Sequence, residues 1–150
     1  MKKKLSRAPE AAQADLFGQP TRPAVLVSRC LLGVPCRYHG KATAFNGFPI
    51  GRPKLIAKLR ERYTLIDVCP ECDGGLPTPR PPTRIIDGRW IADGNDVTAQ
   101  FRKGTRLAIA AARKTGAQRA YLVKNSPACD RDIGMLGRAL RELGLIVINP

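Results

Sequence analysis

Acidic and aromatic residues are scarce in this sequence of 150 residues. Asp and Glu number 12 against 26 Lys and Arg, which gives a formal net charge of +14, and aromatic residues make up 5% of the chain. A basic chain attracts polyanions. Single-stranded nucleic acid is usually held by aromatic side chains that stack on bases, and no stretch here interleaves aromatic with basic residues. Nucleic acid is therefore a partner that the charge allows but the composition does not favour.

Long hydrophobic runs are also missing. No apolar stretch approaches the roughly 20 residues that a membrane span requires. The basic start of the chain is not followed by the apolar segment of a secretory signal. We therefore expect no membrane partner and a location in the cytoplasm, where a reducing environment disfavours disulfides.

The composition is nevertheless that of a folded protein. Hydrophobic residues make up 43% of the chain, which excludes full disorder, and the length is typical of one domain. Residues 1–22 show no sustained hydrophobic period and predict a flexible basic leader. Residues 23–150 then form a single domain.

Four short apolar runs predict the strands of this domain. Each has four or five residues and is nearly continuous in hydrophobicity, as is typical of strands buried on both faces. Apolar residues recur at helical spacing between these runs, over residues 55–63, 101–112 and 133–143, and Gly116 and Gly144 are stop signals for the last two stretches. The predicted strands are residues 24–28, 64–68, 120–124 and 145–148.

This alternation of strand and helix predicts the fold class. It indicates an α/β fold with a mainly parallel, Rossmann-like sheet flanked by helices and joined by right-handed crossovers. Asp87-Gly88, between two apolar pairs, predicts a small appended hairpin.

Five cysteines stand out against a single histidine. Cys30, Cys69 and Cys129 each come at or shortly after the end of a predicted strand. Because the carboxyl ends of parallel strands line the ligand crevice of an open sheet, we expect these thiols at one edge. In a reducing compartment this placement favours a shared metal centre.

The spacing of the cysteines leaves two metals open. Cys30, Cys36, Cys69 and Cys72 could form a four-thiolate zinc site, which leaves Cys129 without a role. An iron–sulfur cluster on Cys30, Cys69 and Cys129 would leave one iron open for substrate. Thiolates suit both metals.

Several motifs in a fixed order resemble a known family. Together they are similar to the bacterial family catalogued as domain of unknown function 523, which includes the 2-thiouracil desulfidases. The resemblance runs from about residue 25 to residue 148. The motifs are Ser28-Arg29-Cys30-Leu31-Leu32-Gly33, Cys36-Arg37-Tyr38, Val68-Cys69-Pro70-Glu71, Gly74-Gly75-Leu76-Pro77-Thr78-Pro79-Arg80, Gly94-Asn95-Asp96-Val97-Thr98 and Ser126-Pro127-Ala128-Cys129.

The resemblance implies an enzyme that depends on a 4Fe–4S cluster. It places the three cluster ligands at Cys30, Cys69 and Cys129, with the fourth iron open to the sulfur of a small thiolated substrate such as thiouracil. It also implies a catalytic acid/base at Glu71 and an active-site hydroxyl at Ser126. The expected reaction is hydrolysis that releases sulfide.

Three further residues are candidates for binding substrate. Ser28 stands in the first motif, and Arg80 and Lys124 could bind an anionic group. Two of the catalytic candidates could instead have purely structural roles. Glu71 could cap a helix that starts after Pro70, and Ser126 could serve only a local turn.

The sequence departs from the family pattern after the last cysteine. Asp130 stands where Gly is usual, and the segment before the final helix is short. Two other functions are compatible with the sequence: a zinc-stabilised basic module that binds RNA, and a sulfur carrier that hydrolyses nothing itself.

Overall fold

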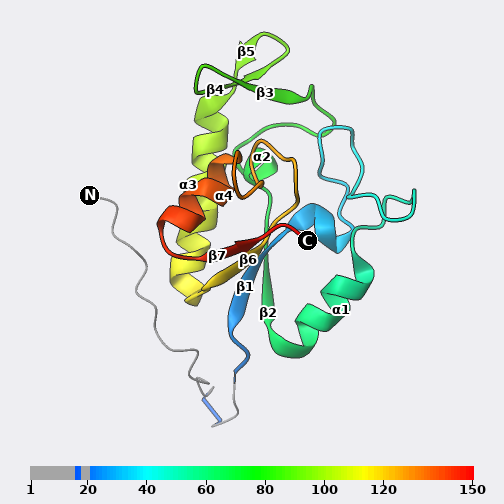
Figure 1. The fold of residues 1–150 in the computed structure, drawn as a ribbon, viewed down its shortest axis with the longest axis vertical. Helices are drawn as coiled ribbons and strands as arrows, with labels where there is room; N and C mark the ends of the chain where they lie inside the picture. Colours follow the sequence, from blue (N-terminus) through cyan, green and yellow to red (C-terminus); the bar gives the residue numbers. More distant parts are fainter. Residues whose placement is uncertain (1–15, 18–20) are drawn as a thin grey trace.

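The computed structural model describes residues 16–17 and 21–150, so most of the predicted leader over residues 1–22 lies outside the described residues. A parallel four-stranded sheet in the order β2-β1-β6-β7 forms the centre of the fold (Figure 1). The α/β class predicted from the sequence is confirmed. The strands are β1 (Ala24–Ser28), β2 (Thr64–Val68), β6 (Arg119–Tyr121) and β7 (Ile146–Ile148).

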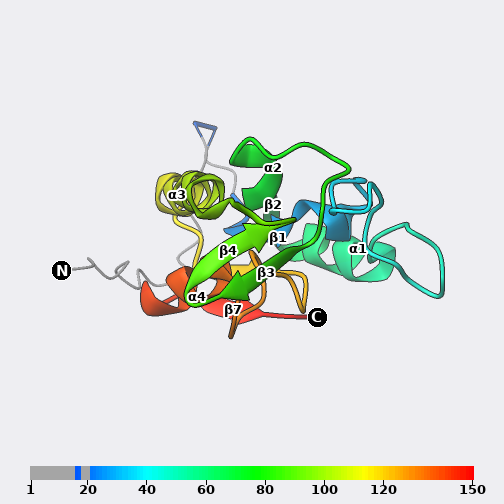
Figure 2. The ribbon, with the colours of Figure 1, turned by 90° about the horizontal axis from the view of Figure 1, so that it is seen from above.

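Helices flank this sheet. The longest helix, α3, packs against the short helix α2 and against α4, whereas α1 lies on the side of β2 (Figures 1 and 2). No helix within residues 16–17 and 21–150 is long and apolar enough to cross a membrane. The helices are η1 (Arg29–Leu32, a 3₁₀ turn), α1 (Pro53–Arg62), α2 (Pro70–Asp73), α3 (Thr98–Thr115) and α4 (Met135–Glu142).

Local sequence signals explain most helix boundaries. Asp96 Oδ1 accepts the Thr98 N–H at 2.9 Å at the start of α3, and Gly116 ends this helix with a φ of 71°. The prediction that the last helix includes Ile133 is wrong. Ile133 lies before α4 and is 52% exposed, because Gly134 is extended and the helix begins at Met135.

The small hairpin predicted around Asp87-Gly88 is present, and it lies at the carboxyl edge of the sheet (Figure 1). Its strands β3 (Thr83–Ile86) and β4 (Arg89–Ala92) are joined by Asp87 and Gly88, which both have positive φ, and a short third strand, β5 (Asn95–Asp96), follows. Trp90 ties this hairpin to the loop that follows β6. Its indole N–H donates to the Pro127 carbonyl at 2.8 Å, and only 8% of the residue is exposed.

Two glycines let helices contact the cysteine loops backbone to backbone. A Cβ on Gly104 of α3 would lie 1.8 Å from the Pro70 carbonyl oxygen. A Cβ on Gly137 of α4 would lie 2.1 Å from the Asp130 oxygen and 2.8 Å from that of Cys129. The segments that follow β2 and β6 are therefore held directly by α3 and α4.

The close contact at Gly104 can be tested by substitution. We expect Gly104→Ala to lower the free energy of unfolding by about 1–3 kcal/mol, because the added methyl group forces the backbones of α2 and α3 apart. Urea unfolding measures this change. Ala110→Leu, on the exposed face of the same helix, is the control and should change little. Increased stability of Gly104→Ala, as helix propensity alone requires, would contradict the contact.

Candidate metal centre

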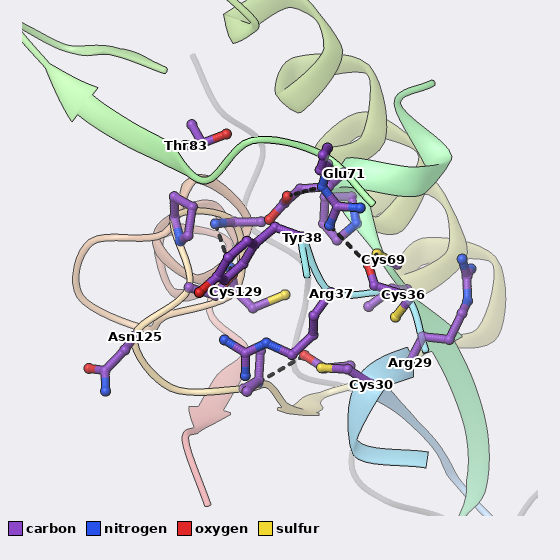
Figure 3. Close-up of a pocket in the computed structure, with 18 of the residues that line it drawn as sticks. Arg29, Cys30, Cys36, Arg37, Tyr38, Cys69, Glu71, Thr83, Asn125 and Cys129 are labelled. Carbon is purple, nitrogen blue, oxygen red and sulfur yellow. Dashed lines mark hydrogen bonds and ion pairs between the residues drawn. The ribbon is translucent and has the colours of Figure 1, made fainter. Parts of the chain in front are cut away.

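The three cysteines expected at the strand ends line one pocket. Cys30 follows β1, Cys69 follows β2 directly, and Cys129 lies in the loop after β6. Ser28 and Val68 are register partners, so β1 and β2 end at the same level. The pocket has a volume of about 200 Å³, and the three side chains reach it from different sides (Figure 3).

The arrangement of the thiols bears on the choice of metal. Within the described part of the chain, no three His, Cys, Asp or Glu side chains are grouped to hold a single metal ion. The Sγ atoms of Cys69 and Cys72 lie 4.0 and 3.6 Å from the Cys36 carbonyl oxygen. Cys129 lies close enough to Cys30 and Cys69 for their charges to raise its pKa. Cys30, Cys69 and Cys129 thus surround one pocket, and thiolates around one cavity are what a polynuclear cluster needs.

Cys36 is a hydrogen-bonding partner of two pocket thiols, and these bonds change the pKa values of all three groups. Hydrogen bonding to Cys36 lowers the pKa of Cys30 to about 7 and that of Cys69 to about 6, although burial acts in the opposite direction. The same hydrogen bonds raise the pKa of Cys36 itself. Hydrogen bonding within this group of three thiols therefore favours a thiolate at this edge of the sheet, and the thiolate is the form that binds metal.

Cys129 is 5% exposed, as is Cys30. Burial raises its pKa, and a hydrogen bond with Ser28 counteracts this effect in part. Ser28 is only 1% exposed, and its Oγ also accepts the Val123 N–H at 2.9 Å. Ser28 thus lines the pocket, where the sequence suggested a substrate contact, but its hydroxyl group already bonds to Val123 and to Cys129.

Ser126 shapes the loop that carries Cys129. Its Oγ accepts the backbone N–H groups of Ala128 and Cys129, both at 3.1 Å, so the local turn considered from the sequence is present. Ser126 also lines the pocket. Because the oxygen acts as acceptor in both bonds, the hydroxyl hydrogen is left to donate toward a ligand.

Asp130 closes the same loop from the other side. Its carboxylate accepts backbone N–H groups from Asn125 at 2.8 Å, Asp132 at 2.8 Å and Ile133 at 3.2 Å. Burial alone would raise the pKa of Asp130, but these hydrogen bonds outweigh it and lower the pKa. The short segment after Cys129 is therefore fixed by one carboxylate.

Glu71 lies beside the thiols. It lines the pocket from α2, its side chain is 12% exposed, and its charge acts on Cys129 (Figure 3). Glu71 lies in the first turn of α2, but no side chain caps this helix from the N-cap position, and Asp73, not Glu71, accepts the Cys69 N–H, at 3.2 Å. Arg80 also lines the pocket, and its Nε donates to Glu71 Oε2 at 2.7 Å.

Lys124 is not brought to this pocket. It is exposed and lines a separate hollow beside β7. Several polar residues that line the pocket were not predicted from the sequence. Arg37 and Tyr38 stand in a quoted motif, and Asn125, with a φ of 60°, follows β6, whereas Thr83 on β3 has no local signal. Figure 3 labels Arg37, Tyr38, Thr83 and Asn125 around the thiols.

Comparison with known proteins identifies the family. The sequence model of the 2-thiouracil desulfurase family matches residues 25–135. The chain belongs to this family. The resemblance to the desulfidases stated from the motifs is therefore confirmed.

Two relatives of this desulfurase family member show how far the similarity reaches. "Uncharacterized protein YbbK" of Bacillus subtilis (strain 168) is 34% identical over 116 residues, which cover 70% of this chain and 72% of YbbK. The solved structure of the [4Fe-4S]-dependent thiouracil desulfidase TudS has a TM-score of 0.72 and 31% identity. The match covers 85% of this chain and 91% of TudS.

The role of Asp130 predicts a pH-dependent loss of stability. Asp130→Ala leaves buried N–H groups without partners, so we expect a loss of about 1–3 kcal/mol in the free energy of unfolding at pH 7. Because the folded pKa is lowered, the carboxylate's contribution is present above its unfolded pKa of about 4 and is lost as the pH falls through the folded value.

Urea titrations of wild type and Asp130→Asn between pH 7 and pH 3 test this linkage, since the difference between them should shrink on acidification. Asp132→Ala is the matched control. The Asp132 side chain is 69% exposed, and its surface ion pairs should contribute little. Equal effects of the Asp130 and Asp132 substitutions would contradict the role of Asp130.

Proposed function

We propose that this protein is a 4Fe–4S-dependent desulfidase. It removes sulfur as sulfide, by hydrolysis, from a small thiolated compound of the thiouracil type. The observation that carries the proposal is the convergence of Cys30, Cys69 and Cys129 on one pocket. Support comes from the family and from the likeness to the [4Fe-4S]-dependent thiouracil desulfidase TudS.

The donor set fits an iron–sulfur cluster. Cys30, Cys69 and Cys129 would hold the cluster, since thiolates are its usual protein ligands. They are 5%, 9% and 5% exposed, so the site is shielded from solvent. Cys36 and Ser28 supply hydrogen bonds to these sulfurs, which is how proteins tune such sites.

The residues around the thiols fit the proton transfers of hydrolysis. When bound, the cluster would supply an iron without a protein ligand, a Lewis acid for the sulfur of a thiocarbonyl group. Glu71 takes a proton from the attacking water as the carbon–oxygen bond forms, and returns it as the carbon–sulfur bond breaks and hydrosulfide leaves. Ser126 donates its hydroxyl hydrogen to orient the substrate. The substrate's oxidation level does not change.

The ligand assignment predicts which thiols retain iron. After anaerobic reconstitution, Cys30→Ser, Cys69→Ser and Cys129→Ser should each lose most of the brown colour, the iron and the acid-labile sulfide. Cys72→Ser is the matched control, because Cys72 lies in the same segment as Cys69, and this variant should keep its iron. Cys36→Ser should keep much of its iron. Stoichiometric zinc that disappears on substitution of Cys36 or Cys72 would contradict the cluster.

The role of Glu71 predicts a loss of turnover without a loss of iron. Glu71→Gln keeps the size of the side chain but cannot carry a proton in the working pH range. We expect sulfide release from 2-thiouracil to fall by about 10²-fold or more at unchanged iron content. Wild-type rates in this variant would remove Glu71 from the mechanism. If wild-type protein with full iron forms no uracil from 2-thiouracil but takes up added sulfide and passes it on, the sulfur-carrier function replaces the desulfidase.

A further inference from the structure

Arg80 is the most enclosed cation of the pocket, and all three nitrogens of its guanidinium group bond to the protein. Its side chain is 4% exposed. Nε donates to Glu71 Oε2 at 2.7 Å, and Nη2 donates to the Cys36 carbonyl at 2.9 Å. Nη1 donates to Thr78 Oγ1 at 2.9 Å and to the Pro77 carbonyl at 3.2 Å. Little donor capacity is left for an anionic substrate.

These bonds join three segments that lie apart in the sequence. The Arg80 N–H also donates to the Tyr38 carbonyl at 2.8 Å, which ties the backbone of the same residue to the segment of Cys36. The Cys36 carbonyl that receives Nη2 lies 4.0 Å from Cys69 Sγ. Arg80 thus connects the loop before β3, the segment after β1 and the acid/base candidate on α2.

Glu71 depends on this single partner for its orientation. Among the described residues, the only hydrogen bond or ion pair of its carboxylate is the one from Arg80 to Oε2. Within residues 16–17 and 21–150, no group bonds to Oε1, and the carboxylate lies close enough to Cys129 for its charge to act there. A group that transfers a proton must be held within hydrogen-bonding reach of the reacting atoms. Oε1 meets this need only while Oε2 is fixed.

We propose that Arg80 is a positioning residue that fixes Glu71 Oε2, so that Oε1 faces the reacting atoms. This role takes the place of the substrate contact expected for Arg80 from the sequence, and it rests on the proposed function. Arginine suits the role because its planar fork reaches several acceptors in fixed directions. A lysine keeps the positive charge but offers one nitrogen for acceptors that lie on different sides.

The test combines two conservative substitutions in the reconstituted enzyme. Arg80→Lys alone should lower kcat for 2-thiouracil by about 10- to 100-fold, the usual scale for loss of a supporting partner, with KM within about twofold of wild type. In the Glu71→Gln background, Arg80→Lys should lower kcat no further, because the group that it positions is already inactive. Rates are compared per bound iron.

Two outcomes of these kinetics would overturn the proposal. A raised KM with unchanged kcat would mean that Arg80 binds substrate directly. An equal loss of kcat in both backgrounds would mean that Arg80 acts independently of Glu71. Arg89→Lys is the matched control, since Arg89 is an exposed arginine that pairs with Asp96 on the hairpin and should leave both constants unchanged.

A second readout needs no activity. In the metal-free protein, the shifts in urea midpoint caused by Arg80→Lys and Glu71→Gln should not add, and the double variant should unfold near the less stable single variant. Additive shifts would overturn the pairing of the two side chains. If the wild-type protein holds iron but releases no sulfide, the proposed function fails. The comparison of the two single variants with the double variant then still decides whether Arg80 positions Glu71.

Discussion

The close approach of two helices to the cysteine loops is the constraint on which the site depends. At Gly104 and Gly137 the helices contact the loop backbones with no side chain between them. The first contact holds the segment of Cys69 and Glu71, and the second holds the segment of Cys129. Parallel pairing of β1 with β2 sets the third position, that of Cys30. The thiols therefore lie in or next to segments that regular elements hold in place, which gives them a fixed geometry before any metal binds.

Hydrogen bonds offset the cost of placing ionisable thiols in a buried pocket. Burial disfavours thiolates, as the raised pKa of Cys129 illustrates. Cys36 lowers the pKa of two neighbouring thiols, and Ser28 partly offsets burial at the third. Arg80 adds the one enclosed positive charge of the pocket lining. The same groups that favour thiolates in the metal-free protein would bond to the sulfurs of a bound cluster.

The sequence predicted the elements whose signals are local. Strands β1 and β2 match the predicted residues, and the cysteines at their ends meet as the carboxyl-edge rule requires. Strand β6 ends before the apolar run that predicted it, because Leu122 and Val123 continue the run into buried loop, and β7 begins one residue after its predicted start. Ile133 follows helical spacing but precedes the helix, since a glycine beside it is extended.

Long side chains were the least predictable part of the site. Arg80 and Lys124 were both expected to bind an anion, but the first is enclosed by protein acceptors and the second lies over another hollow. Their directions depend on segments that meet only in the folded chain. The role of Asp130, which stands where Gly is usual in the family, was also not predictable from the sequence. Its carboxylate accepts three backbone N–H groups, and these come together only in the folded chain.

The central claim is that Cys30, Cys69 and Cys129 hold a cluster whose remaining iron has no protein ligand. Mössbauer spectroscopy of anaerobically reconstituted, ⁵⁷Fe-labelled protein tests it most directly, with and without 2-thiouracil. The account predicts one iron site whose parameters change when the thiolated base is added, while the other three stay as they were. Four sites that all remain unchanged with 2-thiouracil, or a spectrum without a 4Fe–4S cluster, would contradict it.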